Sequence, residues 1–371
     1  MKIGVPTETK AQEKRVGVTP SNVGNLIHAG HQVVVQSGAG MGAGYSDDDY
    51  KQMGTRIGSA EDAWDCDMVI KVKEPLPSEY QYLRDGLIVY TYLHLAADKE
   101  LAEALIDSNA TGVAYETMIG PCGGLPLLFP MSEIAGRMSV QVGAHFLEQP
   151  HQGKGLLLAG ATGVKRGNVV IIGAGTVGFN AAKMAIGLGA NVTILDINAQ
   201  RLAEVESFFD GKIQTLMSNR HNIATAIKDA DLAIGAVLIP GAAAPKLVSE
   251  EMVANMAPGS VIVDIPIDQG GIFETSTHAI THQDPIYISH GVSHYTVANV
   301  PGAVPKTATD ALSSATIPYA LEIANKGLIQ AAEDDNTILT GINTYQGDVT
   351  EQAVAESLDM PYAKFDANLT V

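Results

Sequence analysis

The stretch that most constrains the fold is residues 168–196, NVVIIGAGTVGFNAAKMAIGLGANVTILD. It begins with four consecutive β-branched residues, 169–172, which predict a buried parallel strand. The glycine pattern G-x-G-x-x-G follows at 173–178, and a helical pattern continues to about Leu188. A second β-branched run, 192–195, then ends at an aspartate. Together these segments predict a strand–turn–helix–strand unit.

Each glycine of the turn has a physical role in dinucleotide binding. Gly173 permits the tight turn, Gly175 lets the backbone approach a pyrophosphate, and Gly178 lets helix and strand pack closely. The free N–H groups and positive dipole of the helix N-terminus favour phosphates. The glycines could instead serve packing alone, but the complete unit predicts a dinucleotide site.

The aspartate at the end of the second strand predicts which dinucleotide is preferred. Asp196 lies where a carboxylate accepts hydrogen bonds from the adenosine ribose hydroxyls. A 2′-phosphate there would meet a fixed negative charge, so NAD is expected over NADP. Arg201 lies close enough in sequence to offset that charge, but the strand end fixes the carboxylate of Asp196, whereas a long arginine can swing to solvent.

Length and composition predict a soluble protein of two domains. A chain of 371 residues exceeds the ~250 residues at which single cores stop growing. The formal net charge of -18 argues against nucleic acid or an anionic membrane surface as a partner. No apolar stretch approaches the ~20 residues that span a bilayer, and the N-terminus lacks a signal-peptide pattern. Cys66 and Cys122 form no disulfide framework, so we expect a reducing cytoplasm.

The strand pattern predicts an α/β fold with two doubly wound, mostly parallel sheets. Strands of the first sheet are expected at 2–5, 31–36, 67–72, 87–92 and 112–115. Strands that extend the glycine-rich unit are expected at 212–216, 232–237, 260–265 and 286–288. The tail, 327–371, is expected to be helix and loop. We therefore expect two Rossmann-like domains, with a nucleotide domain at 130–305 inserted into a discontinuous substrate domain at 1–129 and 306–371.

Polar residues follow the predicted strands of the first region directly. Lys73 and Glu74 follow one strand, His94 follows the next, and Glu116 follows the last. Ligands bind beyond the carboxyl ends of strands in open α/β sheets, so these residues are site candidates. The glycine-rich run at 38–44 lacks a following helix and terminal acid, so we interpret it as a flexible connection.

Long motifs throughout the chain carry a family resemblance. They are GVPTETKAQEKRVGVTP (4–20), KVKEPLPSEY (71–80), YTYLHLA (90–96), LPLLFPMSEIAGRMSVQVGAHFLE (125–148), VIIGAGTVGFNAA (170–182), GAVLIPGAAAPKLV (235–248), DIPIDQGG (264–271) and ANVPGAVPKTAT (298–309). On these stretches the chain closely resembles the L-alanine dehydrogenases of the alanine dehydrogenase/pyridine nucleotide transhydrogenase family. The transhydrogenase α subunit resembles it less at the expected catalytic positions.

The resemblance implies reversible NAD-dependent oxidative deamination of L-alanine to pyruvate and ammonium, and a homo-oligomer that we expect to be a hexamer. The family's substrate residues fall on Arg15 and Lys73, and its catalytic residues on His94 and Asp268. With the turn included, the cofactor-binding positions are Ser132, Gly173, Gly175, Thr176, Val177, Gly178, Asp196, Arg201, Ser218, Val237, Leu238, Ile265, Asp268, Val297, Ala298 and Asn299. Departures from the family pattern at Pro266, Thr277 and Thr296 affect the expected fine contacts with NAD.

Elementary chemistry agrees with these roles. A 2-oxo acid requires a cation for its carboxylate; Arg15 offers a bidentate fork, and Lys73 a point charge that can polarise the carbonyl. Loss of the amine requires a proton carrier, and histidine, with an ordinary pKa of about 6.5, serves near neutral pH at His94. Asp268 can hold the substrate nitrogen or the attacking water. Taken alone, it could equally cap a helix.

Sequence leaves alternative functions open. The same fold serves non-catalytic or transhydrogenase-like NAD(H)-binding modules. The pocket size that would separate alanine from glycine or serine cannot be read from sequence. The pairs His278/His282 and His290/His294 have the i,i+4 spacing of metal ligands but lie in loop or strand contexts, so we expect no metal.

Overall fold

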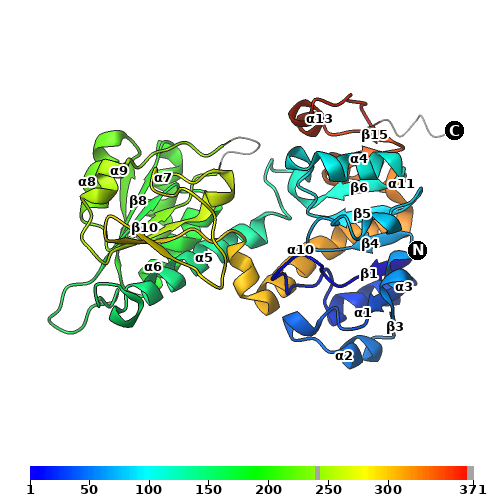
Figure 1. The fold of residues 1–371 in the computed structure, drawn as a ribbon, viewed down its shortest axis with the longest axis horizontal. Helices are drawn as coiled ribbons and strands as arrows, with labels where there is room; N and C mark the ends of the chain where they lie inside the picture. The colour runs from blue at the N-terminus through cyan, green and yellow to red at the C-terminus, as the bar shows by residue number, and fades with distance from the viewer. Residues whose placement is uncertain (239–242, 366–371) are drawn as a thin grey trace. The chain divides into compact units, whose positions relative to one another are not determined.

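The computed structural model describes residues 1–238 and 243–365. The chain divides into two compact units (Figure 1). Unit 1 comprises Met1–Met131 and the described part of Val304–Val371, and unit 2 comprises the described part of Ser132–Ala303. Each unit is built on one mostly parallel sheet, which confirms the expected Rossmann-like α/β class.

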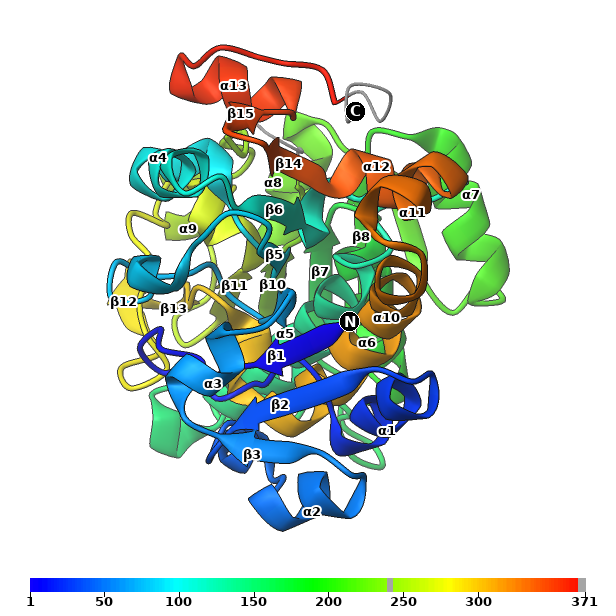
Figure 2. The ribbon, with the colours of Figure 1, turned by 90° about the vertical axis from the view of Figure 1, so that its right-hand side faces the viewer.

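The sheet of unit 1 has the strand order β15-β14-β6-β5-β4-β1-β2-β3. Its strands are β1 (Lys2–Val5), β2 (Gln32–Gln36), β3 (Arg56–Gly58), β4 (Met68–Ile70), β5 (Ile88–Thr91), β6 (Thr111–Ala114), β14 (Ile342–Tyr345) and β15 (Asp348–Val349). Figure 2 shows β14 and β15 at one end of this sheet and β3 at the other. Because β1, β4, β5 and β6 pair in parallel, their carboxyl ends share one edge.

The helices of unit 1 connect and cover these strands. They are α1 (Pro20–His28), α2 (Asp47–Gln52), α3 (Ala60–Trp64), α4 (Lys99–Asp107), α10 (Pro305–Lys326), α11 (Leu328–Asp334), α12 (Asn336–Gly341) and α13 (Gln352–Leu358). At the start of α1, Thr19 accepts a hydrogen bond from Asn22 N–H, and Pro20 occupies the first turn. One apolar core joins Val69 and Val89 of the sheet to Leu101 of α4.

The sheet of unit 2 has the strand order β12-β13-β11-β10-β7-β8-β9. Its strands are β7 (Asn168–Ile172), β8 (Asn191–Asp196), β9 (Gln214–Met217), β10 (Leu232–Gly235), β11 (Val261–Asp264), β12 (Tyr287–Ser289) and β13 (Val292–Tyr295). All pairings are parallel except that of β12 with β13. The chain order reverses between β7 and β10, the switch point where such sheets bind ligands.

Helices cover both faces of the unit 2 sheet. They are α6 (Thr176–Gly187), α7 (Ala199–Phe208), α8 (Arg220–Lys228) and α9 (Glu250–Ala254), and the unit boundary falls within α5 (Phe129–Phe146). Ala233 of β10 packs in one apolar cluster with Ile223 of α8 and Val253 of α9. The adjacent Leu232 points to the opposite face, where it lies against Gly143 of α5.

Three segments depart from the expected strand pattern. The tail was expected to be helix and loop, but it adds β14 and β15 to the sheet of unit 1. The pairing of β14 relies on a polar side chain that hydrophobic patterning ignores: Thr344 Oγ1 accepts from Gly112 N–H at 2.8 Å and donates to Ala110 O at 3.1 Å. The short strands β3 and β13 were also missed.

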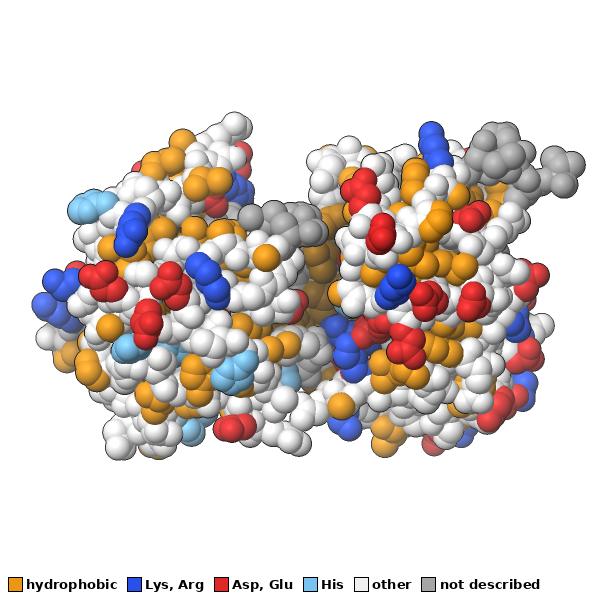
Figure 3. Space-filling model, turned by 45° about the horizontal axis from the view of Figure 1, so that its top comes forward, with side chains coloured by type: hydrophobic (Ala, Val, Ile, Leu, Met, Phe, Trp, Pro, Cys, Tyr) orange, Lys and Arg blue, Asp and Glu red, His pale blue; other side chains and the backbone are white. Residues whose placement is uncertain are grey.

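The surface carries charges of both signs. Acidic and basic side chains are interspersed over the face shown in Figure 3. Among the described residues, no helix has both the length and the apolar character that crossing a membrane requires. Cys66 is buried and Cys122 exposed, and both are free thiols.

Candidate functional site

Adjacent parallel strands of unit 1 bring charged side chains to one edge of the sheet. Lys73 follows β4, His94 follows β5 and Glu116 follows β6, and Arg15 lies in the loop after β1. The charge of Arg15 acts on Lys73, and the charge of Lys73 acts on His94. Unit 1 therefore gathers both predicted substrate residues and the predicted catalytic histidine.

Arg15 is a buried cation matched by Glu13. Its Nε donates to Glu13 Oε1 at 2.7 Å and its Nη2 to Glu13 Oε2 at 2.6 Å. Its third nitrogen, Nη1, donates to Met131 Sδ at 3.1 Å. Burial would raise the pKa of Glu13, but the hydrogen bonds and charge of Arg15 outweigh it and lower that pKa to about 2. The Nε–Nη2 edge of the guanidinium is therefore occupied by an internal carboxylate.

A buried ion triad lies behind Lys73. Lys71 is fully buried, and its Nζ donates to Glu79 Oε1 at 2.9 Å and lies 3.4 Å from Glu8 Oε2. The Glu8 carboxylate also accepts the backbone N–H groups of Val72, at 2.6 Å, and of Lys73, at 3.2 Å. Burial raises the pKa of Glu8 despite the charge of Lys71. By holding the amide of Lys73, the triad fixes the path of the chain as it leaves β4.

Glu74, which follows Lys73 in sequence, has one buried carboxylate oxygen. Its Oε1 pairs with Lys10 Nζ, whereas Oε2 is buried with no hydrogen-bond partner among the described residues. Burial and the charge of Arg15 lower the pKa of the neighbouring Lys73. An N–H donor at this strand end, such as a substrate amine, would satisfy the buried Oε2.

His94 is held in a left-handed backbone conformation, with φ 53°. Glu116 accepts the backbone N–H of His94 and that of Leu93, the latter at 3.2 Å, which fixes the strained turn. The ring stacks on Tyr92 with centroids 5.9 Å apart, and Nδ1 lies 3.9 Å from Glu116 Oε1. Desolvation and the charge of Lys73 lower the pKa of His94 and outweigh the attraction of Glu116. The lowered pKa favours the neutral ring, which can accept a proton.

The glycine-rich turn of unit 2 has the geometry expected for a dinucleotide site. Gly173 adopts φ 104°, and a Cβ there would lie 2.6 Å from Ala236 O. A Cβ on Gly178 would lie 1.8 Å from Gly173 O, whereas one on Gly175 would meet nothing within 4 Å. The N-cap of α6, which begins at Thr176, is Gly175, which has no side chain to cap the helix. An open turn before an uncapped helix fits the pyrophosphate of a dinucleotide.

Asp196 ties the turn to the end of β8. Its Oδ2 accepts from Ala174 N–H at 2.6 Å, and its Oδ1 accepts from Asn198 N–H at 2.8 Å. Arg201 Nε donates to Ala174 O at 2.8 Å, and its Nη1 pairs with Glu204 at 2.9 Å. Arg201 is therefore held beside the turn.

Most of the other predicted cofactor residues come directly after the carboxyl ends of strands in unit 2. The rest lie at the starts of helices. Ser218 follows β9, and its N–H donates to Asp196 O at 2.8 Å. Val237 and Leu238 follow β10, Ile265 and Asp268 lie in the 3-10 helix η6 (Ile265–Gln269) after β11, and Val297, Ala298 and Asn299 follow β13. Ser132 lies in the first turns of α5, and Thr176 and Val177 open α6. Asp268 is exposed within η6 and belongs to unit 2, whereas His94 belongs to unit 1.

The three departures from the family pattern have definite positions in unit 2. Pro266 is buried and interrupts η6 with φ -78° and ψ 32°. Thr277 Oγ1 lies 2.9 Å from His278 Nδ1, and the buried Thr296 Oγ1 donates to His278 O at 2.9 Å. Both threonine hydroxyls therefore contact His278.

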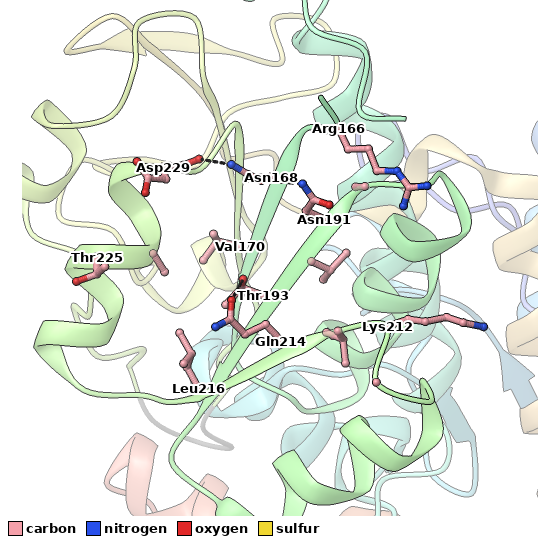
Figure 4. A pocket seen from close by; sticks show the side chains of 15 residues that line it. Arg166, Asn168, Val170, Asn191, Thr193, Lys212, Gln214, Leu216, Thr225 and Asp229 are labelled. Carbon is pink, nitrogen blue, oxygen red and sulfur yellow. Dashed lines mark hydrogen bonds between the residues drawn. The ribbon is translucent and has the colours of Figure 1, made fainter. Parts of the chain in front are cut away.

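A cavity of about 650 Å³ lies at the amino-terminal ends of the strands β7, β8 and β9 (Figure 4). Its walls include the first residues of these strands, Asn168, Asn191 and Gln214, and Asn168 Nδ2 donates to Asp229 O at 3.1 Å. The cofactor residues lie at the carboxyl ends instead, so this cavity is separate from the predicted dinucleotide site.

Sequence reasoning missed the carboxylates that position the cations of unit 1. Glu8 and Glu13 lie in the polar loop TETKAQEKR, where dense alternating charge was the available signal. The contact of Glu8 with Val72 joins residues 64 positions apart, which no local pattern reveals.

Two family models match the chain. The model described as "Alanine dehydrogenase/PNT, N-terminal domain" matches residues 4–135, and "Alanine dehydrogenase/PNT, C-terminal domain" matches residues 139–352. The alanine dehydrogenase of Geobacillus stearothermophilus is 57% identical over 364 residues, 98% of each chain. That of Bacillus subtilis (strain 168) is 57% identical over 363 residues, 98% of this chain and 96% of the relative.

Solved structures give the same family. A structure of L-alanine dehydrogenase matches with a TM-score of 0.94 and 51% identity, covering 97% of this chain and 99% of that one. A transhydrogenase from Sinorhizobium meliloti matches with a TM-score of 0.84 and 26% identity, covering 94% of this chain and 100% of that one.

Proposed function

Because the chain belongs to the alanine dehydrogenase/PNT family, we propose that it catalyses the NAD-dependent, reversible oxidative deamination of L-alanine to pyruvate and ammonium. The observation that carries this proposal is the gathering of Arg15, Lys73 and His94 at one sheet edge of unit 1. Unit 1 is then the substrate domain, and unit 2, with its glycine-rich turn, is the NAD-binding domain.

The residues at the carboxyl ends of the unit 2 strands fit NAD. When bound, NAD accepts the hydrogen of the alanine Cα as hydride. The amides at the start of α6 receive the pyrophosphate, and Asp196 receives the adenosine ribose. Ser218, Val237, Ile265 and the residues after β13 extend the same edge toward the rest of the cofactor.

The cations of unit 1 hold the substrate. Arg15 attracts the substrate carboxylate through its positive charge, which Glu13 holds in place. Lys73 polarises the carbonyl of pyruvate or its imine. The buried oxygen of Glu74 lies in position to accept an N–H from the substrate amine.

His94 moves the protons that deamination requires. Hydride loss from the neutral amine of alanine gives an iminium ion, and water loses a proton as its oxygen attacks the iminium carbon. The His94 ring accepts that proton and returns it to the nitrogen; the C–N bond of the carbinolamine then breaks, the carbonyl of pyruvate forms, and the hydroxyl proton leaves with ammonia as ammonium. Asp268 holds the nitrogen or the attacking water and stabilises the developing positive charge.

The assembly and location of the enzyme are further parts of the proposal. We expect a homohexamer in the cytoplasm that binds small-molecule substrates and neither nucleic acid nor membrane. The net charge of -18 and the two free cysteines support the location and the excluded partners. Sedimentation velocity tests the assembly; an active, stable monomer would contradict it.

The decisive experiment is NADH formation with a panel of amino acids. Purified protein is supplied with NAD and L-alanine, glycine, L-serine or D-alanine, and the reverse reaction with pyruvate, ammonium and NADH. We expect the highest kcat/KM with L-alanine and a requirement for ammonium in reverse. A higher kcat/KM with glycine or serine would reassign the substrate. NADH-dependent reduction of an NADP analogue without any amino-acid activity would favour a transhydrogenase-like module.

A further inference from the structure

A group of potential metal ligands lies at the C-terminal end of α5, in unit 2. It consists of His145 and Glu148 and of His151 in the adjoining 3-10 helix η5 (Gln149–His151), and we call it the HEH cluster. His145 Nδ1 lies 4.0 Å from Glu148 Oε2, and His151 Nε2 lies 3.8 Å from the same oxygen. One ligand atom of each residue lies within 4.8 Å of the others.

The backbone holds these three residues together independently of any ion. Gln152, with φ 67°, turns the chain back, and Gly153 N–H donates to Glu148 O at 3.1 Å. Gly155 N–H and Leu156 N–H both donate to Leu147 O, at 2.9 and 3.2 Å. A Cβ on Gly153 would lie 2.2 Å from Phe146 O, so this close return of the chain requires glycine.

The side chains lie close enough together to reach one ion. The two imidazole rings lie with centroids 3.8 Å apart, and each has a nitrogen within 4.0 Å of one carboxylate oxygen. Zinc bonds of about 2.0–2.2 Å place neighbouring tetrahedral ligands roughly 3.4 Å apart. The two distances to Glu148 Oε2 exceed that value by a few tenths of an ångström. Rotation of these half-exposed side chains is sufficient to close the difference.

A cavity beside the HEH cluster leaves room for the remaining ligands of an ion. It has a volume of about 480 Å³ and is lined by His145 and Glu148 together with the apolar residues Leu156, Leu157 and Leu158. Two histidines and one carboxylate leave coordination positions to be completed by water, as in open metal sites. The cavity therefore leaves room for water on the side of His145 and Glu148.

We propose that the HEH cluster binds one divalent transition-metal ion, of the zinc, cobalt or nickel class, per chain. Ions of this class bind imidazole nitrogen well, whereas magnesium and calcium prefer ligand sets made of oxygen atoms alone. A bound ion joins the last turn of α5 to η5 and so stabilises the return of the chain after the helix. The site is separate from Asp196, the glycine-rich turn and the strand ends of unit 2.

Titration calorimetry with zinc chloride alone tests the proposal. Full-length protein without a polyhistidine tag is treated with chelator, dialysed and titrated at pH 7.5 in the absence of NAD. We expect one zinc ion per chain with a Kd in the micromolar range. We expect affinity to fall at least tenfold in His145→Ala and in His151→Ala, while His221→Ala, an exposed histidine of α8, leaves it unchanged.

Thermal unfolding distinguishes metal coordination by the HEH cluster from a purely structural role of its side chains. Without metal, the variants should unfold at the same temperature as the original chain, because all three side chains are partly exposed. Zinc should raise the unfolding midpoint by about 2 °C or more in the original chain and in His221→Ala only. A Kd above about 1 mM, or a loss smaller than tenfold in either cluster variant, would overturn the proposal.

Discussion

The two units present ligand-binding residues at the same place, the carboxyl ends of parallel strands, but build them differently. In unit 1 these ends carry charged side chains held by buried carboxylates: Arg15 by Glu13, and the amide of Lys73 by Glu8. In unit 2 the glycine-rich turn offers glycines and backbone amides, and the Asp196 carboxylate beside it is oriented by two backbone N–H groups.

The difference follows from what each site must recognise. A small 2-oxo or 2-amino acid offers only a carboxylate and one reacting carbon, so its recognition requires charges fixed in place. Fixing a charge in a buried site requires a counter-charge to offset the loss of water. A dinucleotide is long and offers a pyrophosphate, which backbone N–H groups can bind without any charged side chain.

The largest effect is expected where unit 1 carries the chemistry. His94→Ala should reduce kcat by about 10²-fold or more, because a general acid–base residue typically contributes that much. NADH binding, measured by fluorescence titration, should stay unchanged, because His94 belongs to unit 1 and the glycine-rich turn to unit 2. A variant with near-normal turnover would remove His94 from the mechanism.

The buried triad of unit 1 should contribute strongly to the stability of the fold. Lys71→Met leaves Glu8 and Glu79 buried without their cation, which costs about 3–5 kcal/mol of stability. The matched control is Lys51→Met, because Lys51 pairs with Asp48 on the surface and should contribute little. Urea unfolding compares the two; equal unfolding midpoints would show that the triad does not stabilise the fold.

The same contrast explains what sequence could predict. The glycine-rich unit was readable because Gly173, Gly175 and Gly178 act through local backbone geometry, within one turn. The sequence also predicted that Lys73 and His94 lie at strand ends in unit 1, because each directly follows an apolar run. Their roles were inferred from family resemblance, because a lysine or histidine at a strand end has many ordinary explanations.

The parts that could not be predicted depend on contacts between distant residues. The Glu8–Lys71–Glu79 triad joins a loop after β1 to the end of β4, and β14 pairs with β6 from the far end of the chain. Helix boundaries are also hard to locate from sequence: α5 begins at Phe129, although Ser132 three residues later is a residue type that favours a helix N-cap. Capping propensity alone did not locate that start.

The Glu13–Arg15 pair should make unit 1 sensitive to acid. Folding lowers the pKa of Glu13 from its ordinary 4.5 to about 2, so its stabilisation is present above pH 4.5 and lost as pH falls through 2. The contribution is on the order of 3 kcal/mol. The stability difference between the original chain and Glu13→Gln should narrow over that range. Glu103→Gln, an exposed control on α4, should show no such trend.

Two glycines of the same helix test the backbone basis of the unit 2 site. Gly178→Ala places a Cβ 1.8 Å from Gly173 O, so the turn must shift, and NAD affinity should fall about tenfold or more. Gly187→Ala meets nothing within 4 Å and lies at an exposed position of α6, so it should preserve affinity and gain up to about 1 kcal/mol of stability. Equal NAD affinity in the two variants would contradict the close-packing role of Gly178.

The smallest effect is expected at Asp196, the acidic residue beside the glycine-rich turn of unit 2. Asp196→Ala should weaken NAD binding about tenfold and narrow the NAD/NADP ratio of kcat/KM, because the negative charge that repels a 2′-phosphate is removed. Arg201 sharpens this expectation: it is held at Ala174 O beside the turn, so without Asp196 its cation is positioned to attract the phosphate.

Asp196→Asn separates the effect of charge from that of structure, because the side-chain oxygen of asparagine still accepts an N–H. The change in cofactor preference should therefore appear in both variants, and the loss of NAD affinity should be greater in the alanine variant. Comparable activity of the original chain with both cofactors would contradict the role of Asp196, and unchanged preference in Asp196→Asn would show that shape and not charge selects NAD.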